Sequence, residues 1–277
     1  MPEGPEIRKA ADKVQNAVAN KPILKIEFGQ EHLKPNEADF SNVTIEKIDT
    51  YGKAMVTRFK SANHPKGLNI YTHNQLYGRW VICNPEQVPP SNRQLRLGIY
   101  TPDKWALLYS ASDILVLNNQ KVLDHPFIKK VGKDVLNHAT TVEFVKERLL
   151  SPAYFKRQIG GFLTEQSFVA GLGNYLRCDV LFVTGIRPTR KPSSLSTKQI
   201  KALANAILEL PRQSYQTESV TNDLDLVEEL LAQGLSLEDA RFHVFRRDGL
   251  ACYRCGNTII KKKTGGQPCY TCETCQQ

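Results

Sequence analysis

The start of the chain carries apolar side chains at helical spacing. Ile7, Ala11, Val14 and Val18 follow one another at intervals of four, three and four residues. This spacing places the four side chains on one face of an α-helix. We therefore predict an amphipathic helix over residues 5–20, with its apolar face turned towards a core.

The pattern changes after Lys21-Pro22. Short alternating or wholly apolar runs follow, and Gly, Pro, Asn and Asp separate them. This pattern is typical of an antiparallel β-sandwich or barrel. The predicted strands are Ile23–Phe28, Val43–Ile48, Ala54–Phe59, Leu68–Tyr71, Trp80–Cys83, Leu95–Tyr100, Trp105–Tyr109 and Ile114–Leu117.

Helical spacing returns near residue 141. We predict one helix over Thr141–Leu150 and another over Ser196–Leu210, each with an apolar face. The pattern as a whole predicts an α+β, multi-domain protein. Its expected parts are an N-terminal domain of helix and antiparallel β-sandwich at 1–125, a hinge at 126–150, a helical domain at 151–240 and a cysteine module at 241–277.

Length and composition exclude several classes of protein. The 277 residues are 41% hydrophobic and 23% charged, which is the composition of a globular chain large enough for two modest domains. No run reaches the roughly 18 apolar residues of a membrane span. The first ten residues, MPEGPEIRKA, carry acids where a signal peptide carries bases. We therefore expect a cytoplasmic protein with no membrane partner.

The balance of charge is basic. Lys and Arg number 37 against 28 Asp and Glu, for a formal net charge of +9. Residues 216–240 hold seven acids and no base, whereas residues 241–277 hold seven bases and two acids. Basic segments on both sides of a short acidic one favour a polyanionic partner, most simply a nucleic acid. Solubility alone explains the charge equally well, so charge does not decide between the two.

Five of the seven cysteines fall within the last 26 residues. Sixteen residues separate the pair Cys252 and Cys255 from the pair Cys272 and Cys275, which matches the spacing of a four-cysteine zinc site. We predict one structural Zn²⁺ on these thiolates and a hairpin between the pairs. Two disulfides are the alternative, which a chain without an export signal disfavours. Cys269 also stands three residues before Cys272, but that choice leaves a shorter connecting loop.

The N-terminus offers a reactive amine. Removal of Met1 ahead of a small residue leaves Pro2 as a free secondary amine. Such an α-amino group titrates at about 7.7–8.0, far below lysine, so a usable fraction is unprotonated at neutral pH. The neutral amine can attack a carbonyl carbon, and Glu3 beside it can protonate a leaving oxygen. The alternative is an ordinary helix entry with Pro and Glu in the first turn.

Several motifs, taken in order, resemble one family. They are the opening PEGPEI, Gly52-Lys53, the segment His73–Gly78, the loop Gly171–Asn174 and the four-cysteine tail. Together they closely resemble the bacterial endonuclease VIII group of the formamidopyrimidine-DNA glycosylase superfamily, over nearly the whole chain. The resemblance implies a helix and β-sandwich domain, a helix–two-turn–helix domain and a zinc finger.

The resemblance also implies an activity. It is that of a bifunctional DNA glycosylase and AP lyase of base excision repair, which removes oxidised pyrimidines and cleaves the abasic strand by β,δ-elimination. The expected partner is double-stranded DNA that contains oxidised pyrimidines or abasic sites. We expect a monomer associated with the bacterial nucleoid.

The roles of catalytic residues follow from the same resemblance. Pro2 corresponds to the nucleophile that attacks the deoxyribose C1′ and forms a Schiff base. Glu3 corresponds to the general acid that opens the sugar ring, with Glu6 as a supporting carboxylate. Lys53 corresponds to a lysine that contacts the phosphate next to the lesion.

DNA-binding residues are implied in the same way. Asn174 corresponds to an asparagine that binds a phosphate beside the flipped nucleotide, although its glycine-rich loop on its own is equally a simple turn. Gln75, Leu76 and Tyr77 correspond to the wedge that fills the space left by the extruded base. Without the resemblance, this run is equally a hairpin with Leu76 in the core.

Gln267 departs from the family pattern. The finger hairpin of the family normally carries an arginine here, which grips the phosphates of the lesion together with the asparagine. Glutamine lacks the charge and the two-pronged geometry of arginine. An alternative function is therefore a non-catalytic or weakly catalytic protein that binds damaged DNA.

Overall fold

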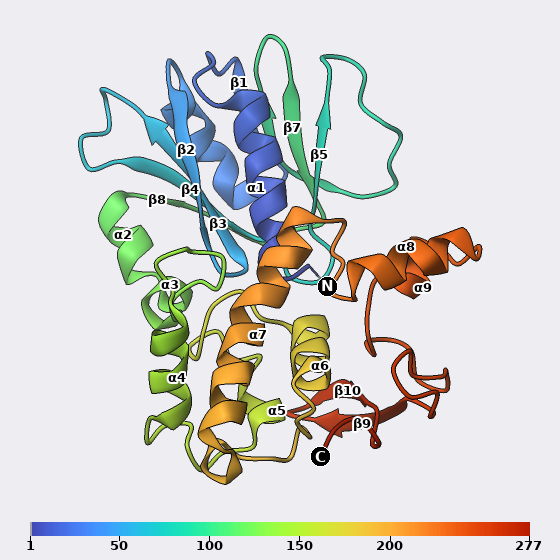
Figure 1. Cartoon of the computed structure of the whole chain (residues 1–277). Coiled ribbons are helices and arrows are strands. Elements are labelled where there is room, and N and C mark those ends of the chain that lie inside the picture. Colours follow the sequence, from blue (N-terminus) through green and yellow to red (C-terminus); the bar gives the residue numbers. More distant parts are fainter. Residues whose placement is uncertain (1) are drawn as a thin grey trace. The chain divides into compact units, whose positions relative to one another are not determined.

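The computed structural model describes residues 2–277, which divide into two compact units at the boundary between Lys130 and Val131. The first unit is a helix with two antiparallel sheets (Figure 1). One sheet has the order β1-β6-β7-β5, with β1 Lys25–Phe28, β6 Leu95–Tyr100, β7 Trp105–Tyr109 and β5 Arg79–Cys83. The other has the order β2-β3-β4-β8, with β2 Thr44–Tyr51, β3 Ala54–Lys60, β4 Leu68–His73 and β8 Asp113–Leu117.

All eight predicted strands are present, and the predicted sandwich is confirmed. The predicted first helix is α1, Gly4–Val18, which contacts strands of both sheets. Its four predicted core residues are at most 2% exposed. The hydrophobic face therefore closes the core between the sheets, as the spacing of apolar residues requires.

The first unit also contains helices that the apolar pattern did not predict. They are the 3₁₀ helix η1 Glu31–Phe40 and the short helices α2 Asn119–Asp124 and α3 Pro126–Lys130. Only Leu33 and Phe40 of η1 are buried, and the Phe40 ring packs edge-on against Phe59. Because only two of its ten residues are buried, and Pro35 lies between them, the sequence of η1 shows no helical periodicity of apolar residues.

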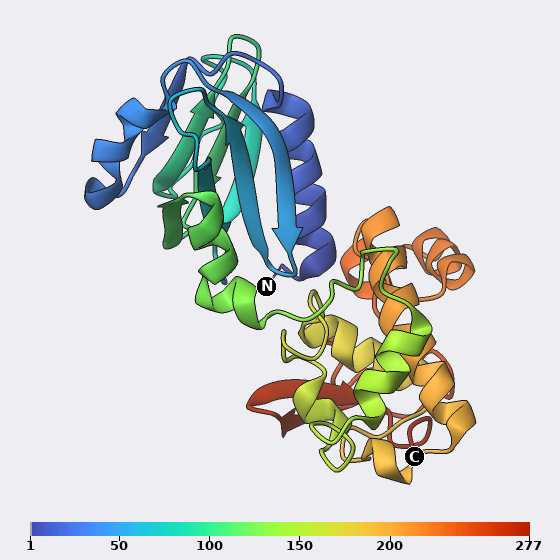
Figure 2. The same cartoon turned by 90° about the vertical axis from the view of Figure 1, so that its left-hand side faces the viewer.

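The second unit is helical and ends in a two-stranded hairpin (Figures 1 and 2). Its helices are α4 Val142–Leu150, α5 Ile159–Phe162, α6 Asn174–Val183, η2 Pro192–Ser194, α7 Thr197–Gln216, α8 Leu224–Ala232 and α9 Leu237–Ala240. The hairpin pairs β9 Ile260–Thr264 with β10 Gln267–Thr271 around Gly265-Gly266. Both glycines have positive φ, which a two-residue turn of this kind requires.

The long helix α7 extends beyond its predicted end at Leu210. Its start is as expected, because Ser196 and Gln199 form a reciprocal capping box. Its end lies past Pro211, which is buried inside the helix. One turn later the Ser214 hydroxyl lies 2.8 Å from the Tyr175 hydroxyl of α6. Tertiary packing therefore stabilises the helix beyond Pro211, although a proline normally ends or kinks a helix.

Asp179 of α6 fixes the segment that leads into the cysteine module. Its carboxylate is fully buried and accepts backbone N–H bonds from His243 at 3.0 Å and Val244 at 3.1 Å. The Thr221 hydroxyl donates to the same group. One carboxylate thus satisfies donors from two loops. Within residues 2–277, no helix is long and apolar enough to cross a membrane.

Asp179→Ala should lower the free energy of unfolding by more than about 2 kcal/mol, because it leaves several buried donors without an acceptor. Thermal unfolding of the full chain measures the effect. Glu228→Ala removes an exposed carboxylate from α8 and should shift the midpoint little. Equal shifts in the two variants would contradict the role of Asp179.

Candidate functional site

The first turn of α1 carries two carboxylates. Glu3 is the residue that caps the helix, and it is only 3% exposed. Its backbone N–H donates to the Glu6 carboxylate at 2.8 Å, and Pro5 occupies the first turn. The positive end of the helix dipole favours both negative charges. Pro2 precedes Glu3 directly, so the chain itself places the Pro2 nitrogen beside these acids.

Lys53 reaches the same acids from the turn between β2 and β3. The pairing of Tyr51 with Ala54 leaves Gly52 and Lys53 as a two-residue turn. Gly52 has φ +60°, a conformation that glycine adopts without steric cost. Burial lowers the pKa of Lys53, and the negative charges of Glu3 and Glu6 oppose that shift. Residues far apart in sequence thus form one cluster of two carboxylates and a buried amine.

His73 is a member of this neighbourhood that the sequence analysis assigned no role. It ends β4 opposite Asp113, and its Nδ1 accepts the backbone N–H of Gln75 at 3.1 Å. Burial is the main cause of its lowered pKa, and the positive charge of Lys53 adds to it, against Asp113. A neutral imidazole suits the acceptor role. Its position directly before Gln75-Leu76-Tyr77 was the sequence feature that could have identified it as part of the site.

The three candidate wedge residues form an exposed loop. Leu76 is 54% exposed and Tyr77 is 70% exposed, so the alternative of a hairpin with Leu76 in the core is wrong. Gln75 has φ +48°, an uncommon conformation for a residue with a side chain. Gly78 closes the loop with an N–H bond to Asn74 at 2.8 Å, and Arg93 donates to the Tyr77 carbonyl at 2.7 Å. The loop is thus held at its ends and apolar at its tip.

The second unit contains the other two candidate DNA-binding residues. Asn174 is the first residue of α6, and the glycine-rich loop leads directly into it. Its side-chain oxygen accepts a hydrogen bond from Arg177, a residue that the sequence analysis missed. Gln267 opens β10, and its side-chain oxygen is buried without a hydrogen-bond partner. Arg177 and Asp179 are charged residues within an otherwise apolar helix. This pattern was the sequence feature that could have indicated buried side chains with hydrogen-bonding roles.

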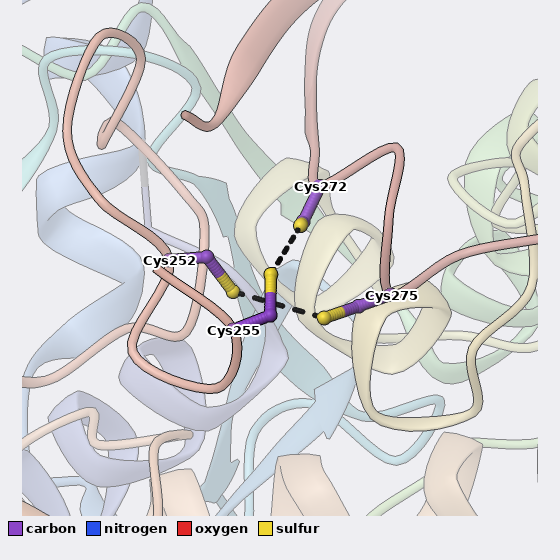
Figure 3. A group of neighbouring side chains, drawn as sticks. All are labelled: Cys252, Cys255, Cys272 and Cys275. Carbon is purple, nitrogen blue, oxygen red and sulfur yellow. Dashed lines mark hydrogen bonds between the residues drawn. The ribbon is translucent and has the colours of Figure 1, made fainter. Parts of the chain in front are cut away.

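Four cysteines converge in the C-terminal module (Figure 3). The sulfur atoms of Cys252, Cys255, Cys272 and Cys275 all lie within 4.8 Å of one another. Cys252 and Cys275 are 3.9 Å apart and Cys255 and Cys272 are 3.4 Å apart, too far for disulfides. Four sulfurs at about 2.3 Å from a tetrahedral zinc ion are spaced by about 3.8 Å. The cluster therefore fits such an ion.

The thiols of the cluster differ in their surroundings. A hydrogen bond from the Asn257 backbone lowers the pKa of Cys255 to about 6, whereas burial raises the pKa of Cys252 and Cys275. Cys269 lies outside the cluster, because its sulfur points to Cys178 of α6 at 3.9 Å. The four sulfurs can hold one metal ion, and Cys269 packs the hairpin against the helix.

Comparisons with known proteins agree over the whole chain. Residues 1–112 match the formamidopyrimidine-DNA glycosylase N-terminal domain, and residues 131–224 match the formamidopyrimidine-DNA glycosylase H2TH domain. Endonuclease 8 of Salmonella typhi is 43% identical over 277 residues, with 100% of both chains covered. The chain belongs to the bacterial endonuclease VIII group of the formamidopyrimidine-DNA glycosylase family.

Further relatives give the same result. Endonuclease 8 of Enterobacter sp. strain 638 is also 43% identical over the full length of both chains. The fold is that of Lactococcus lactis Fpg solved with abasic-site DNA, at TM-score 0.79, 20% identity and 99% coverage of both chains. MutM solved with DNA containing carbocyclic 8-oxo-G gives TM-score 0.80, 20% identity and full coverage of both chains. The enzyme class of the endonuclease VIII group, DNA glycosylase and AP lyase, is therefore that of this protein.

The sulfur geometry predicts which cysteines hold metal. Cys269→Ser should retain about one zinc ion per chain, whereas Cys275→Ser should lose most of it because three thiolates leave the tetrahedral site open. Elemental analysis of the purified variants measures the ratio. Loss of metal in Cys269→Ser with full retention in Cys275→Ser would overturn the assignment.

Proposed function

We propose that this chain is a bifunctional enzyme of base excision repair that removes oxidised pyrimidines from duplex DNA and then cleaves the abasic strand. The observation that carries the proposal is the cluster of Glu3, Glu6 and Lys53 at the end of helix α1, beside Pro2. An amine, a buried acid and a cation at one point are what this chemistry requires.

In the proposed reaction the Pro2 amine attacks C1′ of the damaged nucleotide. The nitrogen–carbon bond forms as the bond to the base breaks, and the base leaves with a proton. Glu3 protonates the ring oxygen, so the sugar opens and an iminium ion forms at C1′. This cation acidifies the hydrogens of C2′. Loss of a C2′ proton to a base expels the 3′ phosphate, and loss of a C4′ proton then expels the 5′ phosphate. Water finally hydrolyses the imine and restores the amine.

Glu6 supports this step by holding the backbone of Glu3. It accepts the Glu3 N–H at 2.8 Å and so fixes the residue that bears the acid. Lys53 supplies positive charge, and we propose that it contacts the phosphate next to the lesion. Its burial strengthens such a contact, because a charge shielded from water interacts more strongly with an anion.

The exposed loop fits a wedge. Chemistry at C1′ requires the nucleotide to leave the helical stack, and an inserted apolar side chain offsets part of the cost of unstacking. We propose that Gln75, Leu76 and Tyr77 perform this insertion. Exposure of Leu76 and Tyr77 to water would otherwise be unfavourable, so the apolar tip favours a partner of this kind.

Further parts of the proposal concern the second unit. We propose that Asn174 and Gln267 contact DNA phosphates and that the metal is one structural Zn²⁺. We propose a monomer active on the bacterial nucleoid, with the four-part domain division given above. One solved relative, Lactococcus lactis Fpg, is described in complex with oxidised pyrimidine-containing DNA, which is consistent with the proposed substrate.

A second candidate function is a protein that binds damaged DNA with little or no turnover. Gln267 is the observation that favours it, because glutamine brings no charge to the position. The two candidates share every DNA-binding feature. They differ in whether the N-terminal amine reacts.

A blocked N-terminus tests the chemistry. One additional residue that remains before Pro2 converts its amine into an amide, and both borohydride trapping on abasic-site DNA and strand cleavage should fall below detection. Unchanged zinc content and thermal unfolding serve as controls for folding. Trapping by the unmodified protein alone supports the enzyme, absence of trapping by either supports the binder, and trapping by both removes Pro2 from the mechanism.

The lowered pKa of Lys53 gives a pH dependence. The protonated amine is the form that binds a phosphate, so activity should fall on the alkaline side at a lower pH than an ordinary lysine, with pKa about 10.4, would give. Lys53→Arg should move this fall to higher pH, because a guanidinium keeps its proton. The measurement is kcat/KM against pH, with the exposed Lys47→Arg as control. Identical alkaline profiles for wild type and Lys53→Arg would contradict the role.

A further inference from the structure

Arg177 is fully buried in the second unit, at 0% exposure, and lies one helical turn after Asn174. Its guanidinium joins segments that are distant in sequence. One terminal nitrogen donates to the carbonyls of Gly160 and Thr264, each at 3.0 Å. The other donates to the Pro268 carbonyl at 2.9 Å and to the Asn174 side-chain oxygen.

The four acceptors of Arg177 are all neutral. Three are backbone carbonyls and one is a side-chain amide, while the Nε atom is buried without a partner. Burial of a guanidinium is unfavourable unless opposite charge or strong hydrogen bonds compensate for the lost hydration. A positive charge held this way projects a favourable field for an anion at the start of α6.

The contact with Asn174 fixes the direction of an amide. Because the side-chain oxygen accepts from Arg177, the nitrogen with its two donor hydrogens occupies the opposite position. A rotated amide would set two donors against each other. Because the Asn174 oxygen is held by Arg177, the amide group of Asn174 can offer an anion its N–H donors and not its oxygen.

The contacts with the hairpin fix a second residue. Thr264 and Pro268 flank the turn, and Gln267 lies between them, paired with Thr264 in the ladder. The guanidinium therefore holds both strand ends of the turn against α6. Cys178, the next residue of the helix, adds a packing contact with Cys269 at 3.9 Å.

We propose that Arg177 is a positioning residue that orients Asn174 and the finger turn around one backbone phosphate of the DNA. This inference rests on the proposed function, since it requires that DNA phosphate is the anion bound. Arg177 itself does not touch the reacting atoms.

A double-mutant cycle with Asn174 tests the inference. The variants are Arg177→Met, Arg177→Lys, Asn174→Ala and the two combinations of an Arg177 change with Asn174→Ala. The probe is a duplex with a tetrahydrofuran abasic-site analogue, which the enzyme cannot cleave. Zinc content and thermal unfolding of each full-length variant show whether the finger is intact. Cys178→Ala is the matched control, because it perturbs the same helix–hairpin interface without touching Asn174.

Arg177→Met should raise the Kd about tenfold or more, as loss of a charge-assisted contact does. The same change in the Asn174→Ala background should raise it less than threefold. Arg177→Lys should give an intermediate loss, and Cys178→Ala should leave Kd within about twofold.

Two results overturn the inference. One is a Kd within threefold of wild type for Arg177→Met with zinc intact. The other is the same loss of binding in the wild-type and Asn174→Ala backgrounds, since additive effects mean that Arg177 does not act through Asn174. If Arg177→Met loses zinc, the Kd of Arg177→Lys is compared instead between the wild-type and Asn174→Ala backgrounds. A wild-type protein that neither binds this duplex nor traps on abasic DNA overturns the proposed function, and the inference with it.

Discussion

Charged side chains buried on helix α6 bind the C-terminal segment to the helical unit. A short cysteine module has too few apolar residues to bury a core of its own, and its cluster includes Cys178 and Phe182 of α6. Asp179 accepts backbone donors of the segment entering the module, and Arg177 donates to carbonyls of its hairpin. One helix therefore provides hydrogen-bond partners for a segment that lies 64 to 91 residues later in the chain. Its charges are tolerated because each finds several partners.

In the first unit, charged side chains at the N-terminal end of α1 are likewise positioned by the packing of a helix. The apolar face of the helix is held by both sheets, which fixes where its first turn lies. Two carboxylates then occupy the positive end of the helix, and a tight turn between β2 and β3 brings Lys53 to them. The position of the acids is thus a consequence of core packing, and their proximity to an amine is the basis of the proposed chemistry.

Gln267 has a buried charged neighbour that its own position in the sequence does not reveal. In sequence, the loss of an arginine there suggests weakened phosphate binding. In the structure, a guanidinium lies directly behind the turn that carries Gln267, on Arg177. At the proposed phosphate site the electrostatic field depends on all the charges nearby, and a buried charge contributes strongly because water does not screen it.

Local sequence patterns predicted part of the fold and much of the candidate chemistry. Apolar spacing gave α1 and all eight strands, and cysteine spacing gave the four sulfurs that converge in the structure. These signals are local, since each depends on residues within one element or on a short loop. The same local rules missed η1, whose ten residues bury only two anchors, and ended α7 before Pro211.

Only the tertiary structure decided the contacts between distant segments. It brought Lys53 to Glu3 and Glu6, exposed Leu76 instead of burying it, and turned Cys269 towards Cys178. It also revealed His73 and Arg177, whose partners lie on other elements or in loops that no periodicity predicts. The physical reason is that burial and hydrogen bonding of a side chain depend on what the rest of the chain packs around it, and spacing along one element does not contain that information.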